Sequence, residues 1–83
     1  MTPAKEIYNQ LCHDPRFEAS EFIIAYDSRF GGLRETSLES FGTSQIPWHR
    51  VRYLRDSSGI RWDRRTKFDS INHSGDQNAT GQT

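Results

Sequence analysis

Apolar positions near the start of the chain repeat with the period of an α-helix. Residues 4–11 carry apolar side chains three and four positions apart, so these share one helical face. They are Ile7, Tyr8 and Leu11. Thr2-Pro3 offers an N-cap and a first-turn proline, and Pro15 disfavours helical geometry at Asp14. We predict a short amphipathic helix that starts near Ala4 and ends near His13.

The following stretch has the composition of a strand. Residues 20–27 are rich in β-branched and aromatic side chains, with apolar groups on both faces, which indicates a central strand. Phe22, Ile24 and Tyr26 fall on one face, and Ile23 and Ala25 on the other. Gly31-Gly32 favours a chain reversal, after which residues 33–36 return as a more polar strand. Residues 37–41 predict a single helical turn or an irregular crossover that inserts Leu38 and Phe41 into the core and is closed by Gly42.

The clearest alternation lies in residues 46–65 and predicts a β-hairpin with its turn at residues 56–59. One face carries apolar side chains towards the core: Val51, Tyr53, Ile60 and Trp62. The opposite face carries polar ones: Arg50, Arg52, Arg61 and Asp63. Leu54 breaks the pattern and covers a neighbour or marks a bulge.

These elements predict one α+β domain over residues 1–71. Its sheet is antiparallel with three or four strands, could curl towards a barrel, and is packed by the short N-terminal helix. From residue 72 onward the composition turns polar, so we expect residues 72–83 to form a flexible polar tail after Ile71 as the last apolar anchor.

Composition narrows the class of protein. Ten aromatic residues among 83 compensate for a low hydrophobic fraction of 33%. The longest apolar run, residues 22–26, is too short to span a membrane, and the N-terminus has no signal-peptide pattern. The single Cys12 fits a reducing compartment, cytoplasmic or nuclear. Without zinc-ligand spacing or a glycine-rich nucleotide fingerprint, we expect no metal and no cofactor.

Charge is segregated although the formal total is zero. Residues 47–67 contain seven Arg or Lys side chains against two Asp side chains, a net +5, and the rest of the chain balances them. Such a local positive field favours a polyanionic partner. In the alternative, the arginines are a solvated face and pair across the sheet with Glu18, Glu21, Glu35 or Glu39.

Two clusters could carry the binding chemistry. His49, Arg50 and Arg52 begin the predicted hairpin behind a proline, where guanidiniums can bind phosphate oxygens in pairs and an imidazole adds a donor. On the adjacent strand, Asp63 can hold Arg50 in one orientation, beside Arg64. His49 could instead be a partly buried ring that donates to a backbone carbonyl.

Further candidates lie beside these clusters. Trp48 could stack on a nucleobase or serve the structure, whereas the alternation of Trp62 with Ile60 favours the core. Tyr26, Asp27 and Arg29 stand at a strand end, a common place for ligand-binding groups, or else form an ordinary turn. An enzyme could use His13 and His49 as an acid–base pair on an RNA phosphodiester, provided that the fold brings them together.

Four segments together resemble a known family, and they lie at residues 14–17, 26–30, 46–53 and 62–64. In their order and spacing they are similar to the RNA cyclic group end recognition domain over about residues 5–66. This small family, long filed as a domain of unknown function, occurs alone or fused to RNA-end enzymes such as two-histidine phosphoesterases and nucleotidyltransferases. It is proposed to recognise RNA ends with a 2′,3′-cyclic phosphate. His13 departs from the tryptophan that the family usually has before the Asp-Pro turn.

The resemblance implies a site with its core at the hairpin: His49, Arg50, Arg52, Asp63 and Arg64, with Tyr26, Asp27 and Arg29 nearby. The expected function is binding of an RNA 3′ terminus, with a cyclic nucleotide as a related ligand, in RNA repair or processing and in company with RNA-end-processing enzymes. Two alternatives remain: a phosphodiesterase or phosphatase that acts on such ends, and a protein-interaction module. We expect no membrane partner.

Overall fold

The structure is a computed structural model that describes residues 2–71. In chain order its elements are helix α1 (Ala4–His13), the 3₁₀ turn η1 (Ala19–Glu21), strands β1 (Ile23–Ser28) and β2 (Gly32–Ser37), helix α2 (Leu38–Thr43), the 3₁₀ turn η2 (Trp48–Arg50), and strands β3 (Val51–Asp56), β4 (Gly59–Asp63) and β5 (Phe68–Asp69). The tail predicted for residues 72–83 lies outside the described residues.

The strands form one antiparallel sheet in the order β2-β1-β3-β4-β5. This confirms the predicted α+β class and the central place of β1. The sheet has five strands because the two residues of β5 pair with β4, and it is open at β2 and β5 rather than closed into a barrel. Residues 20 and 21, predicted as the start of the strand, belong to η1 instead, and the segment before β3 holds η2.

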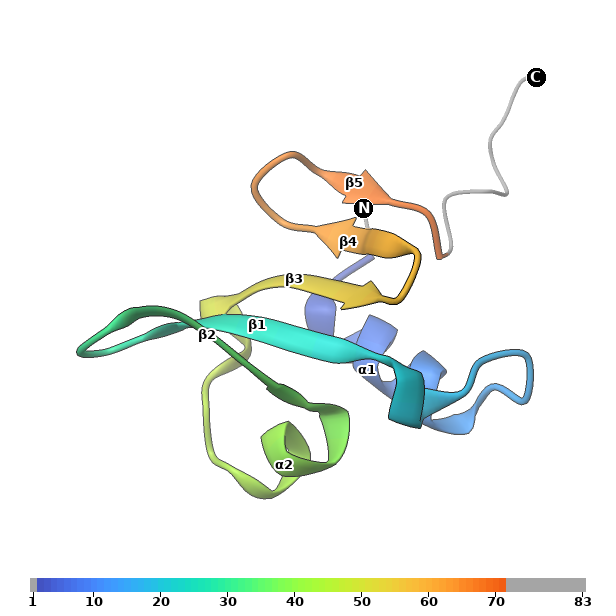
Figure 1. Ribbon diagram of the computed structural model, residues 1–83, viewed down its shortest axis with the longest axis horizontal. Coiled ribbons are helices and arrows are strands. Elements are labelled where there is room, and N and C mark those ends of the chain that lie inside the picture. Colours follow the sequence, from blue (N-terminus) through green and yellow to red (C-terminus); the bar gives the residue numbers. More distant parts are fainter. Residues whose placement is uncertain (1, 72–83) are drawn as a thin grey trace.

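Both helices pack their apolar residues against one face of the sheet. In Figure 1, α1 lies behind the strands and α2 lies beside the β1–β2 hairpin. A single buried cluster joins Ile7 and Leu11 of α1, Leu38 and Phe41 of α2, and a set of sheet residues. The sheet contributes Ile24, Val51, Leu54 and Trp62. This confirms that the apolar face of the N-terminal helix, the helical turn with Leu38 and Phe41, and Trp62 all contribute to the core. Ile71, the predicted last anchor, is buried as well.

Two β-bulges change which hairpin side chains face the core. Between β1 and β3 the register skips Arg52, and between β3 and β4 it skips Arg61. Val51 and Leu54 therefore both face the core although they are three residues apart. Two predicted core positions are wrong for the same reason. Tyr53 lies opposite Asp63 on the outer face, and Ile60 is 39% exposed.

The chain start closes onto the last strands. Pro3, not the predicted Thr2, stands at the N-cap of α1, and its carbonyl accepts from Glu6 N at 3.0 Å and Ile7 N at 3.1 Å. The Thr2 carbonyl accepts from Trp62 Nε1 at 2.8 Å, and the Thr2 amide donates to Asp69 Oδ2 at 3.2 Å. We call these two bonds of Thr2 the N-terminal clasp.

Helix α2 is longer than the single turn expected. Its N-cap is Ser37, whose Oγ accepts from Ser40 N at 3.1 Å. The prediction that Gly42 closes the turn is wrong, because the helix continues to Thr43. Gly42 is required for a different reason: a methyl group at that position would overlap the hydroxyl of Tyr8 on α1.

Candidate functional site

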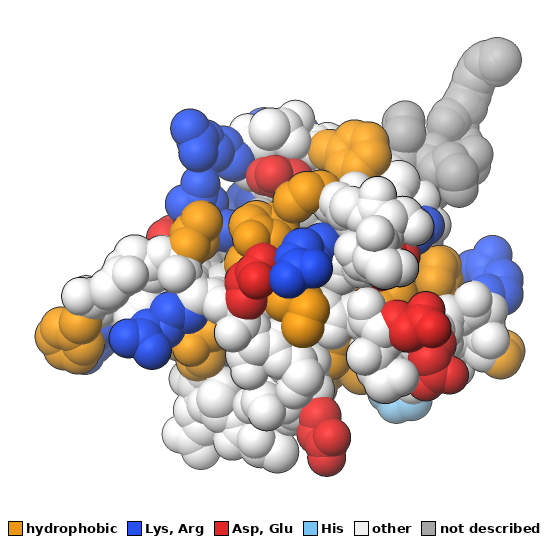
Figure 2. Space-filling model, viewed as in Figure 1, with side chains coloured by type: hydrophobic (Ala, Val, Ile, Leu, Met, Phe, Trp, Pro, Cys, Tyr) orange, Lys and Arg blue, Asp and Glu red, His pale blue; other side chains and the backbone are white. Residues whose placement is uncertain are grey.

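Cationic side chains gather at one end of the sheet. Because the strands are antiparallel, the β1–β2 turn, the start of β3 and the β4–β5 turn meet at this end (Figure 1). Figure 2 shows blue side chains near these turns, while red side chains and other blue ones are scattered over the rest of this face. We call this region the basic end. Its cations are Arg29, Arg34, Arg50, Arg52, Arg64, Arg65 and Lys67.

The arginines further along the hairpin are neutralised. Arg55 Nε lies 2.8 Å from Glu35 Oε2, and Arg61 Nη1 lies 2.6 Å from Asp56 Oδ2. The hydrogen bond from Arg55, followed by that from the Tyr53 hydroxyl, lowers the pKa of Glu35 to about 2. We call these two ion pairs, which lie towards the β3–β4 turn, the paired end. The cross-sheet pairing considered from the sequence thus holds for Arg55 with Glu35.

Most cations at the basic end have no acidic partner within residues 2–71. Arg52 lies 3.4 Å from the carboxylate of Asp27. Within residues 2–71, neither Arg29, Arg50, Arg65 nor Lys67 makes an ion pair. Several unpaired cations in one place repel one another, and an anion relieves that repulsion. This part of the sheet is therefore suited to bind a negatively charged ligand.

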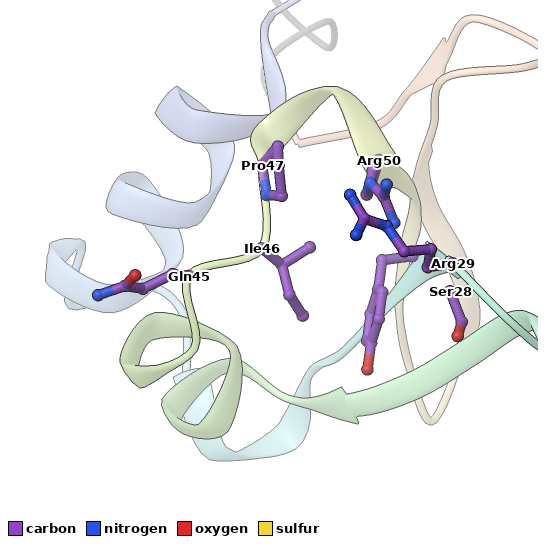
Figure 3. Close-up of a pocket in the computed structure, with 7 residues that line it drawn as sticks. Ser28, Arg29, Gln45, Ile46, Pro47 and Arg50 are labelled. Atoms are coloured by element: carbon purple, nitrogen blue, oxygen red, sulfur yellow. The ribbon is translucent and has the colours of Figure 1, made fainter.

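A pocket of about 410 Å³ opens at the basic end. It is lined by Tyr26, Ser28, Arg29, Gln45, Ile46, Pro47 and Arg50. In Figure 3, Ile46 and Pro47 stand across from Arg29 and Arg50, whose side chains overlap in this view, and Gln45 lies farther out. One wall is thus apolar and the other holds two cations. Such a mixed pocket suits an anionic group joined to a less polar ring.

The segment that carries His49 and Arg50 is fixed from two sides. Arg50 N donates to the Pro47 carbonyl at 3.1 Å, which closes η2. Arg64 holds the turn from the β4 side, because its Nε donates to Val51 O at 2.8 Å and its Nη2 donates to Trp48 O at 2.9 Å. The guanidinium of Arg64, expected to contact phosphate, therefore braces the backbone beneath the pocket.

Aromatic packing fixes the same segment from the helix side. The Trp48 ring is half-buried, with its centroid 5.3 Å from that of Tyr8 and 5.2 Å from that of Phe41. Tyr26, which lines the pocket, also packs on Phe41 with centroids 6.0 Å apart. The pocket wall is therefore tied to the core through Trp48 and Tyr26. Two rings already occupy part of the Trp48 surface that a base would need.

The two aspartates near the site have different contacts. The Asp27 carboxylate pairs with Arg52, and its carbonyl accepts from Arg50 Nη1 at 3.5 Å. Asp63 Oδ1 instead accepts from the backbone amides of Arg65 at 2.8 Å and Thr66 at 3.3 Å. Contacts that orient arginines are thus made by Asp27, whereas Asp63 shapes the β4–β5 turn.

The two histidines within residues 2–71, His13 and His49, do not meet. His49 is exposed on η2, and its ring makes no hydrogen bond or ion pair with residues 2–71, so the partly buried alternative is not observed. His13 lies at the end of α1, where its Nδ1 is 2.9 Å from Asn9 O. Figure 1 shows that this end of α1 lies near the start of β1, at the opposite end of the sheet from η2. The structure therefore does not form the acid–base pair considered from the sequence.

Four pocket residues were not among the predicted site residues: Ser28, Gln45, Ile46 and Pro47. Ser28 lies inside the strand-end segment of residues 26–29, and Pro47 directly precedes the cluster at residues 48–52. The position of Ser28 and Pro47 beside predicted site residues was thus a signal from which they could have been predicted. Gln45 and Ile46 reach the pocket only through the path of the chain after α2, which no local pattern predicts.

Comparison with known proteins gives one family. The family model described as MJ1316 RNA cyclic group end recognition domain matches residues 1–64. No solved structure matches the chain. Among residues 2–71, no group of three or more His, Cys, Asp or Glu side chains is placed to hold a metal ion. Nor does that part of the chain contain a helix long and apolar enough to cross a membrane.

Proposed function

We propose that this chain, which belongs to the MJ1316 RNA cyclic group end recognition domain family, binds RNA termini at its basic end. The family name specifies recognition of RNA ends that carry a cyclic group. The proposed ligand is a 3′ terminus with a 2′,3′-cyclic phosphate, in the context of RNA repair or processing alongside RNA-end-processing enzymes. A cytoplasmic or nuclear location belongs to the same proposal.

The main support for the proposal is that two guanidinium groups without a carboxylate partner among the described residues line the pocket. Arg29 and Arg50 both line it, and neither has a carboxylate partner among residues 2–71. A 2′,3′-cyclic phosphate keeps one negative charge and two oxygens outside its ring, which two guanidiniums can bind by charge-assisted hydrogen bonds. Ile46 and Pro47 on the facing wall suit the carbon skeleton of the ribose.

The neighbouring residues support these two arginines. Asp27 positions Arg50 and Arg52, so Arg52 lies within the same charged group as the pocket arginines. Arg64 and Asp63 hold the turns, and Tyr26 contributes to the pocket lining. The exposed imidazole of His49 is free to donate to a phosphate or ribose oxygen of a longer strand. Stacking of a base on Trp48 is part of the proposal only for the ring surface that Tyr8 and Phe41 leave open.

Binding is favoured over catalysis because His13 and His49, the two histidines within residues 2–71, are far apart. Ring opening by water needs a base for the water and an acid for the leaving oxygen on either side of one phosphate. His49 lies at the basic end, whereas His13 lies at the end of α1. The arrangement therefore supports recognition of the end, which a fused or associated enzyme would process.

The test uses three RNA oligonucleotides of identical sequence that end in a 2′,3′-cyclic phosphate, a linear 3′-phosphate or a 3′-hydroxyl. Fluorescence anisotropy at fixed salt gives the three dissociation constants. We expect the cyclic end to bind at least about 10-fold more tightly than the hydroxyl end, since charged hydrogen bonds are worth about 1.5–3 kcal/mol each. Equal affinities for all three would reject end recognition. Incubation of the cyclic oligonucleotide followed by mass spectrometry should show no gain of water, whereas a hydrated product would reassign the chain as an enzyme.

A further inference from the structure

The tip of the β1–β2 hairpin presents an aromatic side chain to solvent. Phe30 is 91% exposed. The other described aromatic residues are buried or half-buried, apart from Phe68 on β5, which is 46% exposed. A phenylalanine displayed in this way contributes nothing to the core, and water around its ring is unfavourable. Its exposure leaves the ring available for contact with a ligand.

Phe30 stands between two arginines that lack acidic partners. Arg29 precedes it and lines the pocket. On the other side of the turn, the Arg34 guanidinium lies close to the tip, since an ideal Cβ built at Gly31 would be 3.4 Å from Arg34 Nη2. Within residues 2–71 neither Arg29 nor Arg34 forms an ion pair. An exposed ring flanked by unpaired cations has the chemistry of a surface for single-stranded nucleic acid, which offers bases and phosphates in alternation.

The turn holds Phe30 in a defined place. Phe30 N donates to Ser28 Oγ at 3.3 Å, and Gly32 adopts a positive φ of 74° that lets the chain reverse. Figure 1 shows the hairpin extending beyond the rest of the sheet at the basic end. The ring is therefore displayed next to the pocket with both of its faces accessible. Trp48, by contrast, already packs against Tyr8 and Phe41.

We propose that Phe30 is a stacking subsite for a nucleobase of the single-stranded RNA whose terminal phosphate lies between Arg29 and Arg50. This inference rests on the proposed function and adds a contact with a base. The stacking contact does not depend on whether the RNA end carries a phosphate. Arg29 links the two subsites, because it lines the phosphate pocket and is adjacent to the stacking ring in the chain. The subsite accepts any base, since every base offers a π-face.

The experiment compares Phe30→Ala and Phe30→Trp with Phe68→Ala, a matched control that removes the other exposed phenylalanine, away from the β1–β2 tip. The probes are a five-nucleotide RNA with a 2′,3′-cyclic phosphate and the same strand with abasic sugars in its last two positions. We expect Phe30→Ala to weaken binding of the intact strand by about 5- to 150-fold, the range for loss of one stacked base. Phe30→Trp should retain affinity, and Phe68→Ala should bind like the unsubstituted protein.

The abasic strand separates the two levels of the proposal. It should bind the Phe30→Ala variant and the unsubstituted protein with equal affinity, because no base remains to stack. If Phe30→Ala binds the intact strand as tightly as the unsubstituted protein while Arg50→Ala still loses affinity, stacking is rejected and the phosphate site stands. If the unsubstituted protein does not distinguish the cyclic end from a hydroxyl end, yet Phe30→Ala weakens both, end recognition is rejected and the stacking subsite stands. Absence of any RNA binding would overturn both.

Discussion

The basic end and the paired end of the sheet contain the same kind of residue in different states. At the paired end, Arg55 and Arg61 each have a carboxylate within 3 Å, as their distances of 2.8 and 2.6 Å show. At the basic end, Arg29 and Arg50 have none within residues 2–71 and border a pocket. A count of arginines along the hairpin therefore overstates the area available to a ligand. Pairing decides which cations can bind and which are already satisfied.

The difference arises from the path of the neighbouring strands. Glu35 on β2 reaches across β1 to Arg55, and Asp56 stands beside the bulge that contains Arg61. The turns at the basic end place only Asp27 near a guanidinium, at the longer distance of 3.4 Å. Glu18, Glu21 and Glu39 belong to segments that lead into β1 or form α2, so none of them is at the basic end. The net charge of zero thus hides a dipolar distribution along the sheet.

The largest effect should come from removing the two pocket arginines. Arg29→Ala with Arg50→Ala should weaken binding of the cyclic-phosphate oligonucleotide at least about 100-fold, because two charge-assisted hydrogen-bonding groups are removed. Arg55→Ala with Arg61→Ala removes the same charge from the paired end and should change binding by less than about 5-fold. Anisotropy titrations at one salt concentration compare the two double variants. A similar loss of RNA affinity in both double variants would show that the basic end and the paired end do not differ in binding.

Substitution of Arg64 should affect both stability and binding. Arg64→Lys keeps the charge but cannot maintain both bonds to the carbonyls of Val51 and Trp48. We expect the free energy of unfolding to fall by about 1–3 kcal/mol, since one or two partly buried carbonyls lose a charged donor. RNA binding should weaken as well, because the turn that carries Arg50 is no longer braced. Urea denaturation and anisotropy measure the two effects, and a variant of unchanged stability would refute the bracing role.

Gly42 offers a test of the packing beneath the pocket. In Gly42→Ala the new methyl group overlaps the Tyr8 hydroxyl, and relief requires a shift of Tyr8, whose ring packs against Trp48. Overpacking of this kind costs about 1–3 kcal/mol of unfolding free energy. Gly31→Ala is the control, since its methyl group would meet the flexible end of Arg34 at 3.4 Å and Ser28 Oγ at 4.0 Å, which are ordinary contact distances. Thermal unfolding should give a lower midpoint for Gly42→Ala than for Gly31→Ala. Equal midpoints would mean that Tyr8 shifts at no cost in stability.

Arg65 and Lys67 should act through the general field of the basic end. Both are exposed on the β4–β5 turn without ion pairs to residues 2–71. Arg65→Ala with Lys67→Ala should reduce the slope of log affinity against log salt by about 0.7 for each phosphate that the variant no longer neutralises. The ratio of affinities for cyclic and hydroxyl ends should not change. A reduced end preference would instead place these residues in the specific site.

The smallest effect concerns the acid stability of the paired end. The pKa of Glu35 is lowered from 4.5 to about 2, so its ionised form stabilises the fold above pH 4.5. This contribution disappears as the pH falls from 4.5 to about 2 and the carboxylate takes up a proton. In Glu35→Gln the midpoint of urea unfolding should depend less steeply on pH within that window and should lie slightly below that of the unsubstituted protein at higher pH. An unaltered pH dependence would show that the bond from Arg55 does not act in solution.

Much of the fold could be predicted because local patterns determine it. The period of Ile7, Tyr8 and Leu11 indicated α1, and the glycine pair at residues 31–32 indicated the first hairpin. The faces of the second hairpin could not be assigned, because strict alternation assumes one residue per register step and the bulges at Arg52 and Arg61 add another. Leu54 was the visible sign of this irregularity.

The candidate site was predictable in position but not in detail. The cluster at the strand end indicated Tyr26 and Arg29, and the cluster at the start of the hairpin indicated Arg50. The resemblance indicated all three residues, and they line one pocket. Whether an arginine meets a carboxylate, a carbonyl or solvent depends on segments distant in sequence, as Arg64 shows by binding the carbonyl of Trp48, 16 residues away. Such contacts have no local signature.

The N-terminal clasp also bears on how the domain folds. Its bonds span 60 residues from Thr2 to Trp62 and 67 from Thr2 to Asp69, almost the whole described chain. Closing contacts of such high sequence separation has a large cost in loop-closure entropy, so we expect them to form late in folding. The two-residue strand β5 and the first turn of α1 are thereby joined in one cooperative unit. Fraying at one end of the domain therefore breaks hydrogen bonds that stabilise the other end, although 60 or more residues separate the two along the backbone.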